Sequence, residues 1–251
     1  MTRSRLAAGA VILILIVAVG GYVVYDQVLR GDSVAALALP SGSPATAGSS
    51  AGSADGASDA SGGPAASFDG VVAGTWTVTS GSQAGYRVRE QLANLPAQSD
   101  AVGRTDAVTG TITVGGDGTT TTLTAASLQV DMTSLTSDKR MRDNRLRNEG
   151  LQTDAFPTAT FKLTQPVTVP AAAVAGTASD VTLTGDLTIH GVTKSVAIPA
   201  KVQLSGGTVQ VAGSISFPLS DYGIVAPNIG GVIVSIADDG AMEFLVVFTK
   251  D

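Results

Sequence analysis

Apolar and polar side chains alternate with a period of two residues through most of residues 70–251. In VTLTGDLTI the odd positions are mostly apolar and the even positions hold threonine or aspartate. The same pattern recurs in SVAIPAKVQL, TVQVAGSISFPL and AMEFLVVF, and in GTWTVTS, GYRVREQ, VTGTITV, TTLTAASLQVDM and TATFKLTQPVTV. Successive side chains of a β-strand point to opposite faces. The alternation therefore predicts eight or more half-buried strands.

Glycine-rich turn signals separate these segments. They are Gly115-Gly116-Asp117-Gly118, Ser205-Gly206-Gly207 and Asp238-Asp239-Gly240. Many amphipathic strands joined by short connections predict an all-β fold, either an antiparallel barrel or a sandwich.

One segment, SDKRMRDNRLRNEG, lacks the alternation and is expected to form a short helix of about ten residues. Ser137 is the expected N-cap, Asp138 lies in the first turn and Gly150 ends the helix. The helix is expected to be an insertion between two strands.

The first 32 residues predict a transmembrane signal anchor with a short cytoplasmic tip. No charge occurs from Leu6 to Tyr25, and these 20 residues can span a hydrocarbon core of about 30 Å. Arg3 and Arg5 precede the apolar run, so the positive-inside rule places the N-terminus in the cytoplasm and the rest outside. A cleaved signal peptide is the alternative, but its apolar region is normally shorter.

Residues 33–69 are interpreted as a disordered linker. The stretch from Ser41 to Ser67 is almost wholly Ser, Gly, Ala, Pro and Asp. It lacks the apolar side chains needed to offset the entropy of ordering. Residues 70–251 then form a single β-barrel domain on a flexible tether.

Composition excludes several kinds of site. The chain has no cysteine, which rules out disulfides and thiolate chemistry. Its net charge of −6 argues against binding to nucleic acid. His190 is the only histidine, and no Gly-x-Ser-x-Gly motif accompanies it. We interpret His190 as a polar residue at the end of a strand, facing away from the interior, just before a turn at Gly191.

Five cations lie within nine residues of the predicted helix. Arg142 and Arg145 are three residues apart and could share a face that contacts an anionic headgroup. The alternative is local pairing, since Asp138 with Arg142 and Asp143 with Arg147 have the favourable i,i+4 order. Both interpretations stay open on the sequence.

The apolar face of the strands allows two kinds of interior. A small barrel is either filled by side chains or holds one ligand. The inward residues here are mostly Val, Ile, Leu and Ala, which favours a cavity. The single tryptophan, Trp76, is expected to plug or line one end of the interior, where its indole N–H finds a partner.

Three stretches resemble the YceI-like family: GTWTVTSGSQAGYRV, RMRDNRLRNEGLQTDAFPTATF and LTGDLTIHGVTKSVAIP. The resemblance spans residues 75–250 and implies an extended lipocalin-like barrel that binds isoprenoids or other long-chain lipids in an apolar tunnel. This sequence departs from the family at two places where a histidine is usual, which hold Ser82 or Gln83, and Arg145. Leu151-Gln152 replaces a usual Phe-Phe pair. These departures bear on the headgroup rather than on the apolar wall.

The sequence therefore predicts a membrane-anchored, extracytoplasmic protein of the cell envelope that holds a polyisoprenoid, quinone-like or other lipid without transforming it and without a metal or other cofactor. A homodimer is a possible assembly. The alternatives are a solid-cored β domain that acts by protein contact in the cell envelope and an enzyme that uses His190. The expected headgroup contacts are Arg142 and Arg145. The expected ligand-binding residues are Trp76, Tyr86, Val88, Ile112, Leu128, Val130, Phe161, Leu163, Leu187, Ile189, Val211, Phe217 and Phe244.

Overall fold

The computed structural model describes residues 34–40, 72–92, 98–116, 120–226 and 233–251. The predicted transmembrane segment, and residues 33 and 41–69 of the predicted linker, lie outside the described residues. Within the described ranges, every helix is too short or too polar to cross a bilayer.

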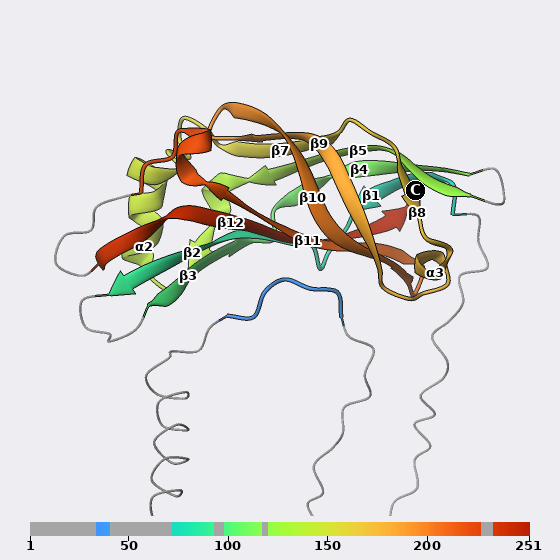
Figure 1. Cartoon of the computed structure of the whole chain (residues 1–251), viewed down its shortest axis with the longest axis horizontal. Coiled ribbons are helices and arrows are strands. Elements are labelled where there is room, and N and C mark those ends of the chain that lie inside the picture. The colour runs from blue at the N-terminus through green and yellow to red at the C-terminus, as the bar shows by residue number, and fades with distance from the viewer. Residues whose placement is uncertain (1–33, 41–71, 93–97, 117–119, 227–232) are drawn as a thin grey trace, which may run out of the picture.

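The described residues form twelve antiparallel strands (Figure 1). Their bounds are β1 Gly74–Val78, β2 Gln83–Leu92, β3 Ser99–Thr105, β4 Val108–Gly116, β5 Thr121–Asp131, β6 Thr136–Ser137, β7 Thr158–Leu163, β8 Val167–Val169, β9 Ser179–Ile189, β10 Val192–Ser205, β11 Thr208–Pro218 and β12 Ile233–Lys250.

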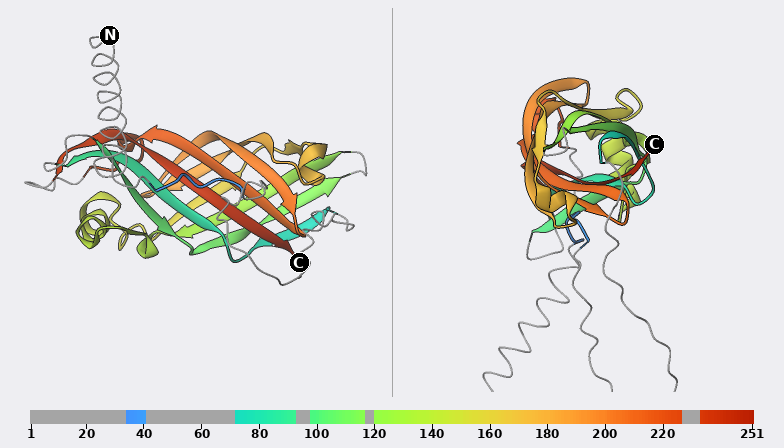
Figure 2. Two further views of the ribbon diagram at one scale, coloured as in Figure 1. Left: turned by 90° about the horizontal axis from the view of Figure 1, so that it is seen from below. Right: turned by 90° about the vertical axis from the view of Figure 1, so that its right-hand side faces the viewer.

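Eight of these strands close an elongated barrel, which confirms the predicted all-β antiparallel barrel. Their order is β1-β4-β5-β7-β9-β10-β11-β12, and β12 pairs back to β1 with Trp76 opposite Lys250. The right-hand view of Figure 2 looks along the barrel and shows the strands wrapped around one interior. Closure leaves these strands without a free sheet edge along most of their length.

The barrel wall is interrupted at one end. There β2 takes over from β1 as the partner of β12, β3 pairs with β2, and the far edge of β3 pairs only with the two-residue strand β6. Residues 132–150 cover this end: the 3₁₀ turn η2 (Met132–Ser134), β6, the helix α2 (Arg140–Arg145) and the π-helical turn η3 (Leu146–Gly150). The short helix α3 (Ala171–Val174) lies near the opposite end (Figure 1).

The helical insertion differs from the prediction at its start. The helix begins at Arg140 with Lys139 as N-cap, so Ser137 is not the cap. Ser137 instead belongs to β6, and its amide and hydroxyl both donate to the Asp143 carboxylate, at 3.0 and 2.6 Å. Because strand pairing with β3 holds Ser137 in extended conformation, the helix starts later. Together α2 and η3 have the expected length and end at Gly150.

The turn predicted at Asp238-Asp239-Gly240 is wrong. These residues lie within β12, which runs on for 18 residues. Pairing with β2 shifts register between Ile236 and Gly240, which marks a bulge rather than a chain reversal. A bulge absorbs extra residues while the strand continues, so the turn-forming composition reflects a local bend.

A two-residue turn joins β9 to β10. Ile189 pairs with Val192, and both His190 (φ 52°) and Gly191 (φ 73°) have positive φ. Two successive positive φ values are typical of a type I′ hairpin turn. The predicted bend at Gly191 is confirmed, and His190 is part of it.

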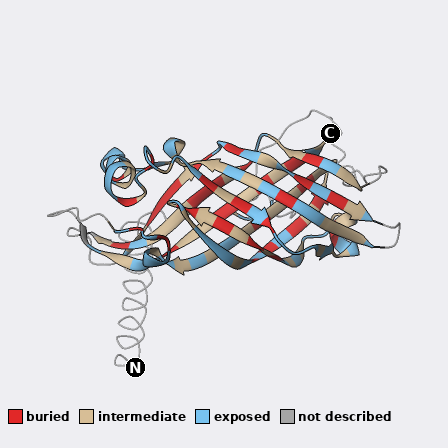
Figure 3. Ribbon diagram, turned by 90° about the horizontal axis from the view of Figure 1, so that it is seen from above, coloured by how far each residue is buried: buried red, intermediate tan, exposed pale blue. Residues whose placement is uncertain are grey.

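Buried and exposed positions alternate along the strands, as the sequence predicts (Figure 3). In β9, for instance, Leu183, Gly185, Leu187 and Ile189 are buried while the even-numbered residues between them are more accessible. Trp76 is fully buried, and its indole N–H donates to the carbonyl of Val72 at 3.0 Å. It belongs to the packed apolar core, as does Leu163.

Candidate ligand-binding cavity

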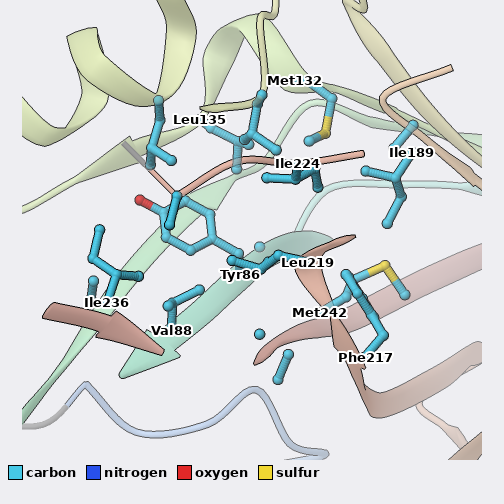
Figure 4. Close-up of a pocket in the computed structure, with 18 of the residues that line it drawn as sticks. Tyr86, Val88, Met132, Leu135, Ile189, Phe217, Leu219, Ile224, Ile236 and Met242 are labelled. Atoms are coloured by element: carbon cyan, nitrogen blue, oxygen red, sulfur yellow. The ribbon is translucent and has the colours of Figure 1, made fainter. Parts of the chain in front are cut away.

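The main cavity among the described residues lies at the α2 end of the barrel and has a volume of about 120 Å³ (Figure 4). Its wall is almost entirely carbon. Side chains that lie far apart in the sequence meet in this cavity, because β2, β11 and β12 converge beneath the helical insertion. The labelled lining residues in Figure 4 are Tyr86, Val88, Met132, Leu135, Ile189, Phe217, Leu219, Ile224, Ile236 and Met242.

Strand β2 supplies one wall of this cavity through every second residue. Tyr86 and Val88 face inward, and Glu90 continues the same phase. Opposite Tyr86 on β3 lies Gly103, where an added Cβ would stand 2.3 Å from the tyrosine ring. The missing side chain at Gly103 thus lets the aromatic ring lie against β3.

The helical insertion and the segment after β11 close the cavity from above. Met132, Leu135 and Leu146 contribute apolar side chains from residues 132–150. The 3₁₀ turn η4 (Leu219–Tyr222) adds Leu219. The η4 turn is fixed to the β9–β10 turn, because the Nδ1–H of His190 donates to the Tyr222 carbonyl at 3.0 Å.

That bond defines the role of His190. A carbonyl can only accept, so Nδ1 carries the proton. Nε2 is buried without a hydrogen-bond partner in the described part of the chain, and the ring packs at 4.3 Å between centroids against Phe156. His190 therefore serves as a clamp between two turns at the cavity roof.

A second apolar cavity of about 50 Å³ adjoins the first. The two share Ala84, Val130, Ala159 and Met242 as lining residues. Met242 is the largest and most flexible of these four, and unbranched methionine adapts readily to irregular spaces. A third space of about 40 Å³ lies further along the same strands, near α3.

The polar end of the main cavity is built on a buried ion pair between Glu90 and Arg142. Glu90 is 2% exposed and Arg142 is 6% exposed. One guanidinium nitrogen of Arg142 binds Glu90 and the other binds Asp138. Burial by itself lowers the pKa of Arg142, but the attraction of the two carboxylates outweighs it and holds the pKa above its ordinary value. Arg142 is therefore a cation that is already neutralised.

Two hydrogen-bond donors remain unpaired at this end. Within the described residues, the Tyr86 hydroxyl and the Nε–H of Arg142 are both buried and make no hydrogen bond of ordinary geometry, although the Ser137 side chain lies near enough to Tyr86 to lower its pKa slightly against the larger effect of burial. Burial raises the pKa of Tyr86, so its hydroxyl keeps its proton and can donate. Unsatisfied buried donors are uncommon and costly, about 1–3 kcal/mol each. An oxygen atom supplied by a ligand would satisfy them.

The family model for the YceI-like domain matches residues 76–248, which is more than half of the chain. The chain belongs to the YceI-like family. The comparison with curated proteins finds no match.

Solved structures show the same fold as this YceI-like domain. A polyisoprenoid-binding domain from Saccharophagus degradans, implicated in plant cell wall breakdown, has 20% identity and a TM-score of 0.55, covering 71% of this chain and 99% of its own. BcnA from Burkholderia cenocepacia has 19% identity and a TM-score of 0.51, covering 68% of this chain and 98% of its own. At these identities the likeness establishes the fold alone.

The predicted site residues of the YceI-like domain fall into separate groups. The main cavity is lined by Tyr86, Val88, Val130, Ile189, Phe217 and Arg142. The second cavity is lined by Leu128, Val130, Phe161, Leu187 and Phe244. Ile112 and Val211 line the third space, while Trp76 and Leu163 are core residues.

Arg145, the second predicted headgroup contact, lies apart from the main cavity. Its side chain is 45% exposed and pairs with Glu149 at 2.6 Å, and it is not among the lining residues of the cavity. Of the two predicted local pairs, Asp138 with Arg142 is present. Asp143 instead accepts from Ser137, and Arg147 donates to the carbonyl of Thr133 at 3.2 Å.

Sequence reasoning missed the partner of Arg142. Glu90 follows Tyr86 and Val88 in the inward phase of β2, so an ionisable residue occupies an apolar position. A carboxylate there needs a buried cation, and this was the available signal. The residues from the cavity roof, such as Leu135 and Ile224, lie outside the alternating strands and gave no comparable signal.

Proposed function

We propose that this protein binds, without transforming it, an apolar chain that ends in a neutral, oxygen-bearing head, such as a quinone-like lipid. The observation that carries the proposal is the carbon-lined main cavity with two unpaired donors at one end. The polyisoprenoid-binding description of the Saccharophagus relative supports the same ligand class.

The charge around Arg142 favours a neutral head over a diphosphate. Glu90 and Asp138 already compensate the guanidinium, and Glu90 also lines the cavity. A diphosphate would have to lie beside this buried carboxylate, and like charges in a poorly hydrated site repel strongly. A carbonyl or hydroxyl oxygen accepts from Tyr86 and Arg142 without adding charge.

The volumes of the cavities also determine how much of the ligand's hydrocarbon chain the barrel can enclose. A cavity of about 120 Å³ accommodates only a short piece of a hydrocarbon chain. A longer chain needs the second cavity, and rotation of Met242 would join the two. This supports ligand binding over a solid core at the α2 end.

We further propose that residues 1–32 anchor the protein in the membrane with the barrel on the extracytoplasmic side. The support is the 20-residue uncharged run flanked by Arg3 and Arg5. An anchored barrel would exchange ligand with the bilayer from which such lipids come.

The test compares three probes of equal chain length on the full chain in detergent: a prenylated benzoquinone, a prenyl diphosphate and the prenyl hydrocarbon. Tyr86→Phe should weaken quinone binding about tenfold, which corresponds to one hydrogen bond of about 1.4 kcal/mol, and leave the hydrocarbon unchanged. Isothermal calorimetry or fluorescence displacement measures the affinities for the quinone and for the hydrocarbon.

Tyr222→Phe is the matched control, because the Tyr222 hydroxyl is also buried and has no hydrogen-bond partner among the described residues, but Tyr222 does not line the cavity. It should leave all three affinities unchanged. Failure of every probe to bind would contradict the proposal, and tighter binding of the diphosphate than of the quinone would overturn the choice of head.

A further inference from the structure

Glu243 lies on the outer side of the barrel wall and is nevertheless only 2% exposed. In β12 the inward phase is carried by Met242, Phe244 and Val246, so the odd-numbered residue between them points away from the interior. A carboxylate on this face would normally be solvated. Groups on the outer side of the barrel therefore shield the Glu243 carboxylate from solvent.

Two arginines account for part of this cover. The Arg87 Nε lies 2.8 Å from one carboxylate oxygen of Glu243, and an Arg104 nitrogen lies 3.2 Å from the other. Arg87 also binds Asp100 at 3.0 Å. Burial alone lowers the pKa of Arg87, but Glu243 and Asp100 outweigh it and raise the pKa above its ordinary value. The arginine thus remains charged.

Residues 34–40, with the sequence VAALALP, provide the rest of the cover. The amide of Leu37 donates to Glu243 at 2.7 Å, and Arg87 donates to the carbonyl of Val34 at 2.7 Å. Arg104 donates to the carbonyl of Ala35. Figure 2 shows this segment, in blue, running along the outer wall beside β2 and β12. This part of the predicted linker is therefore held against the barrel.

All three contacts are between barrel side chains and the main chain of the segment. The segment pairs with no strand in the described residues, so its attachment does not depend on a sheet edge. Leu37 and Leu39 are partly buried, while the alanines between and beside them are exposed. The site therefore fits a short, extended, uncharged segment with two leucines in alternate positions.

We infer that the outer wall formed by Arg87, Arg104 and Glu243 is a docking site whose occupant is residues 34–40 of the same chain, acting as a latch that shortens the tether. This inference rests on the proposed membrane anchor for its consequence, but not for the docking itself. With the latch docked, only residues 26–33 separate the apolar run from the barrel, a span of at most about 28 Å. With the latch released, residues 26–71 could extend to about 160 Å.

The absence of cysteine makes the test direct, because two introduced cysteines carry the only spin labels. Ala36→Cys in the latch and Ala107→Cys on the barrel are both at exposed positions. In the full chain in detergent, electron–electron double resonance should show one narrow distance between the labels. A broad distance distribution in this parent chain would overturn the inference.

Leu37→Pro removes the amide that donates to Glu243 and leaves the barrel untouched. It should lower the ratio of docked to released latch by about tenfold, as the loss of one hydrogen bond to a charged group implies. Ala38→Pro is the matched control, since none of the hydrogen bonds described here uses its amide, and it should keep the narrow distance.

Mixtures of singly labelled chains decide whether the latch docks in cis. A narrow distance between two different chains would contradict the inference, because the occupant would then be a second copy. The experiment uses no ligand probe, so its outcome is independent of the lipid-binding test. It also needs no bilayer, so a failed membrane anchor would leave the narrow distance in place.

Discussion

At the scale of single residues, the apolar interior of the barrel contains a few buried polar atoms, and these determine which ligand head it can bind. The hydroxyl of Tyr86 is the clearest case, because the ring lies over Gly103 and its oxygen makes no hydrogen bond of ordinary geometry within the described residues. Glu90 and Arg142 pair with each other, which leaves the tyrosine hydroxyl and the Nε–H of the arginine as buried donors on two residues that line the cavity. Selectivity for the ligand head depends on these two donors.

Tyr86 also predicts how stability falls at alkaline pH. Burial raises its pKa above the ordinary value of 10.0, so the unfolded chain loses the phenol proton at lower pH than the folded chain. This contribution is fully present below pH 10 and is lost as the pH rises above it. The expected slope is about 1.4 kcal/mol per pH unit from this residue.

Urea unfolding at pH 9, 10 and 11 measures that slope, and tyrosinate absorbance follows the ionisation. Tyr86→Phe should flatten the decline between pH 10 and 11 relative to the parent chain. An equal slope in the two proteins would show that Tyr86 ionises freely in the fold.

At the scale of elements, the β9–β10 hairpin shows how a turn fixes a cavity roof. His190 adopts a left-handed conformation and its ring reaches the carbonyl of Tyr222. His190→Asn should keep the turn, because asparagine followed by glycine is the favoured type I′ pair. His190→Val should destabilise the chain by about 1–3 kcal/mol, since a β-branched residue resists positive φ.

Thermal unfolding of the two variants separates backbone conformation from the ring contacts. Comparable losses in His190→Asn and His190→Val would mean that the imidazole, rather than the turn geometry, is what stabilises the hairpin.

Most strands could be predicted because one face of each is buried against a single interior. Strand β3 was missed, since Ala101 and Val102 are both buried and break the alternation. The continuous β12 was missed because a bulge has the same composition as a turn. About a third of the residues that line the main cavity come from residues 132–150 and 219–226, whose positions depend on tertiary contacts that no local period encodes.

At the scale of the whole molecule, the described part of the barrel holds at least three apolar spaces, and Met242 lines both the main and the second cavity. Met242→Ala should join them, so that lengthening a prenylated quinone by one prenyl unit raises affinity about tenfold where the parent chain shows no gain. The same variant should lose about 2–3 kcal/mol of stability without ligand.

Affinities across a series of quinones of increasing chain length, together with unfolding of the ligand-free protein, test this prediction. Met141→Ala is the control because Met141 is 62% exposed. A parent chain that already gains affinity with every added unit would show that Met242 is no barrier.

Strand β2 joins the two proposed sites in one stretch of chain, because Tyr86 and Val88 face the cavity while Arg87 faces the latch. Insertion or deletion of one residue there would exchange the two faces. Guanidinium groups would enter the lumen, and aromatic and aliphatic side chains would meet the latch. Point substitutions can therefore alter ligand preference or tether length independently. A one-residue shift of the inward and outward alternation along β2 would abolish ligand binding and latch docking together.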